Sequence, residues 1–466
     1  MPVPYCLLHT AYCFDRVWSR REIAVISRTI NPSTDLATAR ARHLAGVKVW
    51  AYACIDRYRS APATDVHDQA TYTTAWAPYI EATGDRHAMA FLKDLRDRIR
   101  DHFVATDRWH HGYWRAQEAH HGTEHFELFL GTLFRLDPGD AETKAQLLDA
   151  AEHIGNWVPG IPRWFDKETG LFRSMYLGTE VVRTEPGMNL NVPDHLRLVN
   201  LCLLAHEVSG TDRYLTFADA YARRWADAIV GCDQLPIGLT PEGPITTMAG
   251  SAEEAYRSFA GMAGHLDDDV DRAENLLASN GTGALLSLWT LTGEAIYREA
   301  VERSLDVLAT QLADPDAGPA AAALRTYRQV TGDDRYDAAI RAAYETCTAQ
   351  RDPFAIGRIG IEPDIQRPER PRGVGKRSDM PNWFEDGAPR LHNPITLSVV
   401  AEIRGDADLA TRALDLARTY LELARETLPD GRHHGCAANT VSAVARGHGR
   451  NNHAGVVTAV GKLTDG

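Results

Sequence analysis

The polar and apolar positions of this chain repeat a two-helix pattern. An apolar stretch ends at Thr-Gly or a similar pair, an Asp follows, and a second amphipathic stretch begins. Apolar residues three and four positions apart occupy one face of an α-helix. Gly adopts the left-handed conformation that ends a helix, and Asp or Thr accepts hydrogen bonds from the free N–H groups of the next one. Each copy therefore predicts a tight helical hairpin.

The pattern occurs at least six times. In one copy Tyr336, Ile340 and Ala343 fall on a single helical face. Stretches with strand-like alternation are short and scarce, so we expect few short strands. Hairpins that repeat stack into a solenoid or a closed ring. The copies start at Ile80, Phe134, His206, Thr290, Gln329 and Glu402.

The connections between the copies favour the ring. They are long and unequal, and they carry Trp, His, Asn and Asp, whereas repeat solenoids have short turns of near-constant length. We therefore expect an all-α toroid of the (α/α)6 type, with long loops at one mouth where a ligand binds. A single toroid domain is expected over residues 1–466, with residues 1–40 as an N-terminal extension that packs on it.

The hairpin TGDDRYDAAI, with an apolar helix before it, resembles the α/α-toroid (six-hairpin) carbohydrate-active enzymes. The resemblance covers roughly residues 40–460. This group includes glycoside hydrolases, polysaccharide lyases and sugar epimerases. The resemblance implies the toroid fold and a carbohydrate ligand, and it assigns the chain to no single family.

Composition excludes several classes of partner. The net charge of −13 argues against nucleic acid. No apolar run reaches the length of a membrane-spanning helix. The N-terminal residues lack the pattern of a signal peptide, and the seven cysteines have no paired spacing. We expect a cytoplasmic protein whose partner is an oligosaccharide or another small molecule; its oligomeric state is not indicated.

The stretch RWHHGYWRAQEAHHGTEHFELFLG, at residues 108–131, holds five of the nineteen histidines. Its apolar residues from Phe126 onward have helical spacing, so we expect a helix that begins near Gly122. The N-terminal ends of the inner helices of a toroid line its mouth. The candidate catalytic side chains at this helix start are His121, Glu124 and His125, and the preceding loop offers His111, Tyr113, Trp114 and Arg115.

The letters HGTEH also match H-x-x-E-H, a zinc-binding pattern of peptidases. Those enzymes have α/β domains and need a distant third ligand, which the hairpin pattern does not supply. We therefore predict no cofactor. A divalent metal held by His121 and His125 is the alternative, and a histidine packed inside a helix is a third interpretation.

Two further stretches combine Asn with His. Asn191 and His195 are candidate catalytic residues, and they flank Asp194, a candidate for substrate binding that follows a proline at a helix start. Near the C-terminus, Asn452 and His453 precede a small apolar stretch. That Asn-Asn-His triplet resembles one in toroid alginate-type lyases, where the asparagine neutralises a uronate carboxylate; an aromatic pair follows it there, but Ala-Gly follows here. A first-turn acid and a polar helix cap are the structural alternatives.

Two loops place Trp-Phe beside acids. Trp164 and Trp383 are candidate sugar-stacking platforms, because aromatic faces pair with apolar sugar faces. Asp166 and Glu385 are carboxylates next to them, and Arg173 is a further candidate for substrate binding. Packing within the loops is the structural alternative.

The clusters contain more His, Asn, Tyr and Arg than paired acids, which favours β-elimination at a uronic-acid-containing oligosaccharide. In this hypothesis Tyr113 or His121 moves the proton. The carboxylate is held by Arg115, Asn191 and Asn452, and His125, His195 and His453 serve as bases or orienting groups. A glycoside hydrolase with paired carboxylates is the alternative. Three further alternatives are less favoured. They are a sugar epimerase, a zinc-dependent hydrolase and a non-catalytic ligand-binding toroid.

Overall fold

Six helical hairpins make up most of the described chain. The computed structural model describes residues 33–60, 72–108, 111–112, 117–155, 157–259, 268–310, 312, 318–348 and 394–427. The hairpins are α4 (Ala77–Thr83) with α5 (Arg86–Ala105), α7 (Gly131–Leu136) with α8 (Ala141–Glu152), α9 (Leu196–Ser209) with α10 (Asp212–Gly231), α13 (Gly281–Thr292) with α14 (Ala295–Ala309), α15 (Gly318–Thr331) with α16 (Asp337–Thr348), and α17 (Pro394–Arg404) with α18 (Ala407–Thr427). All six copies of the sequence pattern are confirmed.

The turns have the chemistry that the sequence predicts. In the α4–α5 turn Gly84 has a φ of 63°, a left-handed conformation that favours glycine. The carboxylate of Asp85 then accepts hydrogen bonds from the backbone N–H groups of His87 at 2.9 Å and Ala88 at 3.1 Å. These bonds satisfy donors that have no partner within the first turn of α5.

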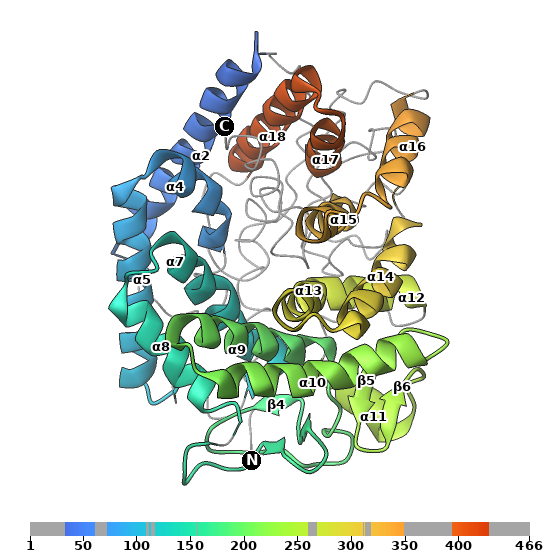
Figure 1. Ribbon diagram of the computed structural model, residues 1–466. Helices are drawn as coiled ribbons and strands as arrows, with labels where there is room; N and C mark the ends of the chain where they lie inside the picture. Colours follow the sequence, from blue (N-terminus) through green and yellow to red (C-terminus); the bar gives the residue numbers. More distant parts are fainter. Residues whose placement is uncertain are drawn as a thin grey trace, which may run out of the picture.

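The hairpins curl into a closed ring (Figure 1). The first helices α4, α7, α9, α13 and α15 lie toward its centre, and α5, α8, α10, α14 and α16 lie outside them. Helix α2 (Leu36–Tyr58) packs along α18, so the ring is closed by two segments far apart in the sequence. Asp415 of α18 accepts a hydrogen bond from Ser33 Oγ at 2.7 Å. The all-α toroid fold is confirmed.

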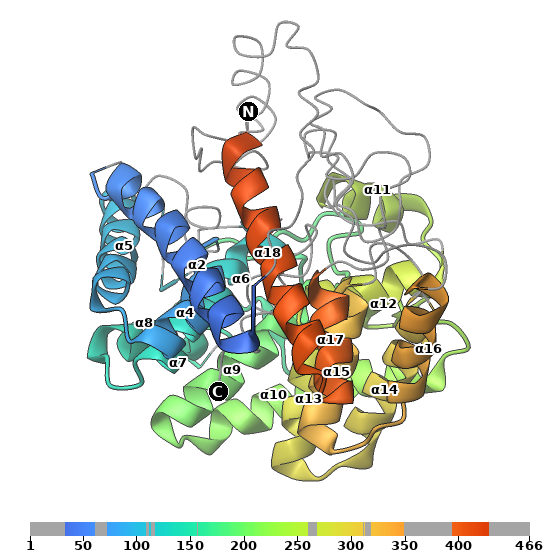
Figure 2. The same cartoon turned by 90° about the horizontal axis from the view of Figure 1, so that it is seen from above.

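The ring has two different faces. Each first helix ends at a tight turn, whereas the second helices lead into longer segments. Figure 2 shows the α9–α10 and α13–α14 turns at its lower edge and α11 (Gly250–Phe259) near its upper edge. We call the face with the longer segments the long-connection face. It carries the short elements between hairpins, including α6 (Ala119–Glu124), η2 (His125–Leu130), η3 (Pro193–His195) and α12 (Asp269–Ala278).

The described strands are short, as expected. They form three antiparallel pairs and contribute no layer of their own. The pairs are β1 (Gln117–Glu118) with β4 (Tyr176–Leu177), β2 (Phe165–Asp166) with β3 (Leu171–Phe172), and β5 (Gly238–Thr240) with β6 (Gly243–Ile245).

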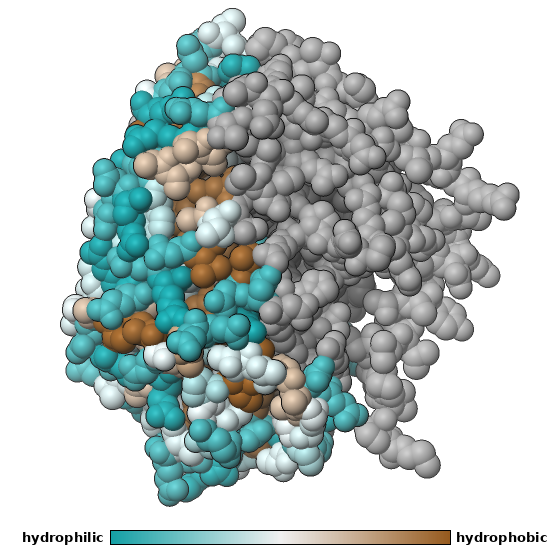
Figure 3. Space-filling view, turned by 90° about the vertical axis from the view of Figure 1, so that its right-hand side faces the viewer, coloured by the Kyte–Doolittle hydropathy of each residue, from teal (hydrophilic) through white to brown (hydrophobic). Residues whose placement is uncertain are grey.

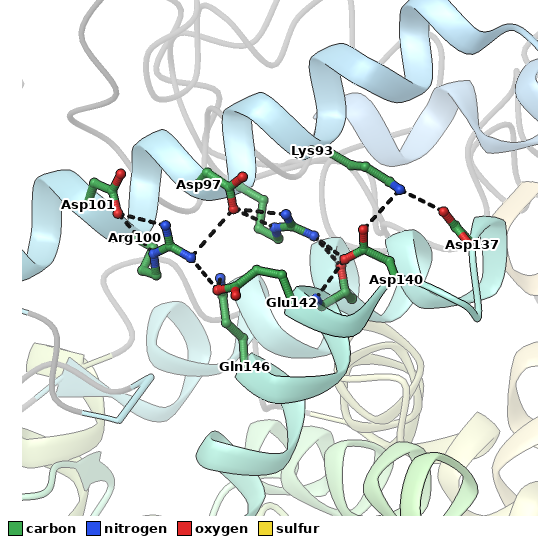
Figure 4. Close-up of polar contacts among 10 residues, drawn as sticks. Lys93, Asp97, Arg100, Asp101, Asp137, Asp140, Glu142 and Gln146 are labelled. Carbon is green, nitrogen blue, oxygen red and sulfur yellow. Dashed lines mark hydrogen bonds and ion pairs between the residues drawn. The ribbon is translucent and has the colours of Figure 1, made fainter.

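A network of ion pairs connects α5 to the start of α8 (Figure 4). Lys93 Nζ lies 2.6 Å from Asp137 and 2.9 Å from Asp140. Arg96, only 4% exposed, pairs with Asp140 and donates to Thr143 Oγ1 at 2.8 Å. A buried guanidinium needs such partners, because an unpaired charge in the interior is costly.

The one described face that Figure 3 shows is mainly hydrophilic. Seen from the side of α12, α14 and α16, hydrophobic residues form narrow strips among polar ones (Figure 3). Among the helices that the structure describes, none is long and apolar enough to cross a membrane.

Several sequence predictions lie outside the described residues. These are the roles of Tyr113, Trp114, Arg115, Trp383, Glu385, Asn452 and His453. Residues 1–32 of the expected N-terminal extension also lie outside them. Residues 36–40 of that extension belong to helix α2, which is part of the ring.

Candidate functional site on the long-connection face

The helix of the histidine-rich stretch begins earlier than predicted. It starts as α6 at Ala119 rather than near Gly122, and from His125 it continues as the π-helical segment η2. The backbone N–H of Ala119 donates to Met175 O at 2.9 Å, a contact across the chain that local spacing does not reveal. Helix α6 packs against η3 and α9. The fold therefore brings the backbone of this stretch next to η3, which carries Asp194.

The segment η2 buries two ionisable groups. His125 is 1% exposed and packs against Phe126 and Phe129. Burial lowers the pKa of His125 to about 3, so the ring is neutral. Glu127, which is 2% exposed, accepts a hydrogen bond from Asn280 Nδ2 at 2.8 Å. The roles predicted for the side chains of His121 and Glu124 lie outside what the structure describes.

Sequence reasoning missed Glu127. The signal was present, because a carboxylate stands in the apolar run HFELFLG, where helical spacing predicts burial. A buried carboxylate needs polar partners and often marks a functional position.

Asn191 is fully buried and binds backbone groups. Its Oδ1 accepts from Phe172 N at 2.9 Å and from Tyr221 Oη at 3.1 Å, and its Nδ2 donates to Phe172 O at 2.8 Å. Trp225 Nε1 donates to Tyr221 Oη at 3.2 Å. The side chain thus fixes the β2–β3 segment onto α10. The predicted contact of Asn191 with a substrate carboxylate stays a prediction; the described contacts are structural.

His195 has a similar role at the start of α9. Its Nδ1 accepts from Val192 N at 3.1 Å, and its Nε2 lies 3.2 Å from Ser174 O. The ring stacks on Phe172 with 5.0 Å between centroids. Burial lowers the pKa of His195 to about 4, so the neutral ring donates from Nε2 to the Ser174 carbonyl. Both ring nitrogens have backbone partners.

The described loop residues divide into buried and surface positions. Trp164 is 0% exposed and stacks on Phe172 at 5.1 Å between centroids. A sugar platform needs an accessible aromatic face, so the described structure supports loop packing for Trp164. Asp166 accepts from the backbone N–H of Glu168 at 3.0 Å within a turn, and Arg173 is exposed.

Asp194 combines partial exposure with a buried partner. Its side chain is 22% exposed, and Oδ1 lies 3.6 Å from Nε of Arg197, which is 1% exposed. It belongs to η3, directly before α9, and both α6 and α12 pack against η3. Among the described acids predicted from the sequence, Asp194 lies at the start of an inner helix.

The described contacts of His111 are with α8 and its C-terminal cap and not with the residues around Asp194. It follows α5 in a left-handed conformation with a φ of 51°. Its Nδ1 lies 3.2 Å from Asp149 Oδ1 of α8, and its ring stacks on that of His153. The sequence singled out His111, but it did not indicate the two partners on α8.

Comparison with known proteins finds similar solved structures but no similar sequence family. No family model and no curated protein matches the chain. An unsaturated glucuronyl hydrolase from Bacillus sp. GL1, described as responsible for the degradation of glycosaminoglycan, is 16% identical, with a TM-score of 0.46 over 84% of this chain and 97% of that one. An unsaturated glucuronyl hydrolase specific for heparin is 11% identical, with a TM-score of 0.45 over 80% and 98%. A D-mannose isomerase is 10% identical, with a TM-score of 0.44 over 72% and 87%. The fold assignment stands on the ring of hairpins itself.

Proposed function

We propose that this protein is a carbohydrate-active enzyme that hydrolyses a uronate-containing oligosaccharide at the site around Asp194. The observation that carries the proposal is the partly exposed Asp194 carboxylate at the start of α9, beside the buried guanidinium of Arg197. A carboxylate in this position can move a proton or attack a sugar, and the nearby cation suits an acidic substrate.

A second carboxylate comes from the neighbouring inner element. Glycoside hydrolysis uses two carboxyl groups that flank the bond to be cleaved. Segment η2, which carries Glu127, packs against α9. Glu127 binds Asn280 Nδ2, and Asn200 Nδ2 donates to Asn280 O at 3.3 Å. Arg197 and Asn200 follow Asp194 in three-residue steps, so successive members are adjacent on the helix surface. Asn280 thus contacts both Glu127 and the helix α9 that follows Asp194.

Elimination at a uronate is the alternative that the sequence favours. Its proton-moving and carboxylate-holding groups include Tyr113, Arg115 and Asn452, which lie outside the described residues. Asn191 and His195 have their polar atoms bonded to the backbone. Among the described residues, the geometry therefore supports hydrolysis better than elimination.

The substitution Asp194→Asn tests the proposal. We expect it to lower kcat/KM by about 100-fold or more, because general acid–base groups contribute about 10²–10⁴-fold to rates. Asp212→Asn is the matched control, because Asp212 is exposed at the start of the outer helix α10. Circular dichroism checks that both variants fold.

The assay uses a panel of uronate-containing oligosaccharides. Two of the matched structures are named unsaturated glucuronyl hydrolases, so unsaturated uronyl oligosaccharides are tested first. Hydrolysis releases reducing ends without creating a new unsaturated uronate, whereas elimination creates one and raises ultraviolet absorbance. Full activity in the Asp194→Asn variant, or cleavage always accompanied by a new unsaturated uronate, would overturn the proposal.

A further inference from the structure

Three metal-ligating side chains meet where the ends of α5 and α8 approach each other. Asp149 and His153 are four residues apart, on α8 and at its C-terminal cap, so they share one side of the helix. His111 comes from the turn after α5. The three residues each offer one ligand atom, and these atoms lie within 4.8 Å of one another. None of them belongs to the site around Asp194.

His153 is prepared to act as an electron-pair donor. It is 3% exposed, and its Nδ1 lies 2.7 Å from the Asp149 backbone carbonyl, so Nδ1 carries the proton and donates. Its Nε2 then has a lone pair, and this buried atom has no hydrogen-bond partner among the described residues. Burial lowers the pKa of His153, which keeps the ring neutral. Metal-bound histidines characteristically donate their second ring nitrogen to a carbonyl or carboxylate in this way.

His111 and Asp149 supply the accessible half of the cluster. His111 Nδ1 lies 3.2 Å from Asp149 Oδ1, and the side chains are 51% and 49% exposed. The His111 and His153 rings stack with 3.8 Å between centroids and 11° between planes. Two protonated imidazoles would repel each other at this distance. Two neutral imidazoles do not, and together with the carboxylate they offer three ligands to one cation.

We propose that His111, Asp149 and His153 bind a divalent transition-metal ion of the zinc type. Two imidazoles and one carboxylate are a ligand set that zinc accepts, whereas magnesium and calcium prefer oxygen ligands alone. Bond lengths of about 2.0–2.2 Å in a tetrahedral site place ligand atoms about 3.4 Å apart. The exposed side chains of His111 and Asp149 rotate to close the remaining gap, and water completes the coordination. The ion clamps the turn after α5 to α8.

Metal binding by the whole chain tests this inference. The full-length protein is freed of metal with a chelator and titrated with Zn²⁺ by calorimetry and with Co²⁺ by visible spectroscopy. We expect one saturable tight site, with the intense visible absorption of four-coordinate Co²⁺. His111→Ala and Asp149→Asn each weaken binding about tenfold or more. Both side chains are about half exposed, so these variants are expected to fold.

The matched control is His87→Ala, which removes an exposed histidine on α5 away from the cluster. It leaves the tight site unchanged. Binding weakens as pH falls below about 6, because protons compete for the imidazoles. The inference is overturned if no saturable site is found, or if His111→Ala and Asp149→Asn bind both ions as the wild type does. The readout is metal binding, so it is independent of the proposed hydrolytic function.

Discussion

At the residue scale, buried imidazoles couple the stability of this protein to pH. His43 on α2 is 1% exposed, and within the described part of the chain neither of its ring nitrogens has a hydrogen-bond partner. Burial, together with the charge of Arg418, lowers the pKa of His43 to about 4. His195 has its pKa lowered to about 4 by burial as well. Both rings must therefore be neutral in the folded protein at neutral pH.

We expect the protein to lose stability as pH falls from about 6.5 to about 4. In that range the unfolded chain binds protons that the folded chain excludes, so the free energy of unfolding decreases with falling pH. One histidine shifted from 6.5 to about 4 contributes up to about 3 kcal/mol. Urea denaturation of the wild type and of His43→Leu across this range measures the effect.

The His43→Leu variant should lose less stability on acidification than the wild type, because Leu has no proton to gain. His87→Leu, at an exposed position, is the control and should keep the wild-type pH dependence. Equal slopes for the wild type and His43→Leu would show that His43 is not responsible.

Individual residues also show which parts of the candidate site the sequence could predict. Asn191, Asp194 and His195 stood out because Asn and His flank an acid that follows a proline at a helix start. Their partners did not, because Phe172 and Ser174 reach them through a loop whose path local spacing does not define. Sequence reasoning therefore predicted the group, but it did not distinguish the partly exposed acid from the buried side chains around it.

At the element scale, the hairpins were predictable because their signals are local. A glycine that ends one helix and an acid that caps the next lie within a few residues of each other. The start of α6 was predicted wrongly because it depends on Met175, far along the chain. The change to π-helix at His125 likewise has no local signal that we could identify.

The α7–α8 turn gives a prediction at this scale. Asp140 accepts from Thr143 N at 2.8 Å as the N-cap of α8 and also pairs with Lys93 and the buried Arg96. Asp140→Ala removes the cap and one of the two carboxylates that pair with the buried Arg96; Asp97 remains, 2.9 Å from the Arg96 guanidinium. We expect a loss of about 2–3 kcal/mol in the free energy of unfolding, measured by chemical denaturation.

The control for this experiment is Asp101→Ala on α5. Asp101 pairs with Arg100 but is 68% exposed, so its loss should cost less than about 1 kcal/mol. A similar cost for both variants would contradict a structural role for the Asp140 network.

At the scale of the whole molecule, the sequence predicted a ring from unequal loops between equal hairpins. It did not reveal how the ring closes. Helix α2 lacks the hairpin pattern, and part of it was assigned to an N-terminal extension, yet it packs along α18. Closure depends on contacts between segments hundreds of residues apart, which no local periodicity encodes.

Asp415 tests this closure. It is 1% exposed and accepts from the backbone N–H and the hydroxyl of Ser33, beside the first turn of α2. Asp415→Ala should lower the free energy of unfolding by about 2–3 kcal/mol, because two partly buried donors of Ser33 lose a charged acceptor. Far-ultraviolet circular dichroism and tryptophan fluorescence should shift together, since a closed ring unfolds as a unit.

Asp408→Ala provides the comparison, because Asp408 lies on the same helix and is exposed. Its transition should stay within about 0.5 kcal/mol of the wild type. Separate transitions for the two probes in Asp415→Ala would indicate that the ring behaves as independent hairpins.

The tight turns on one face of the ring determine the electrostatics of the opposite, long-connection face. Every first helix ends at a tight turn, so its N-terminus points to the long-connection face. The peptide dipoles of these helices add up to partial positive charge at that end of the inner layer. The outer helices run the opposite way but lie farther from the ring axis. Under the proposed function, this local positive charge at the start of α9 favours an acidic sugar beside Asp194 and Arg197, although the whole protein carries a net charge of −13.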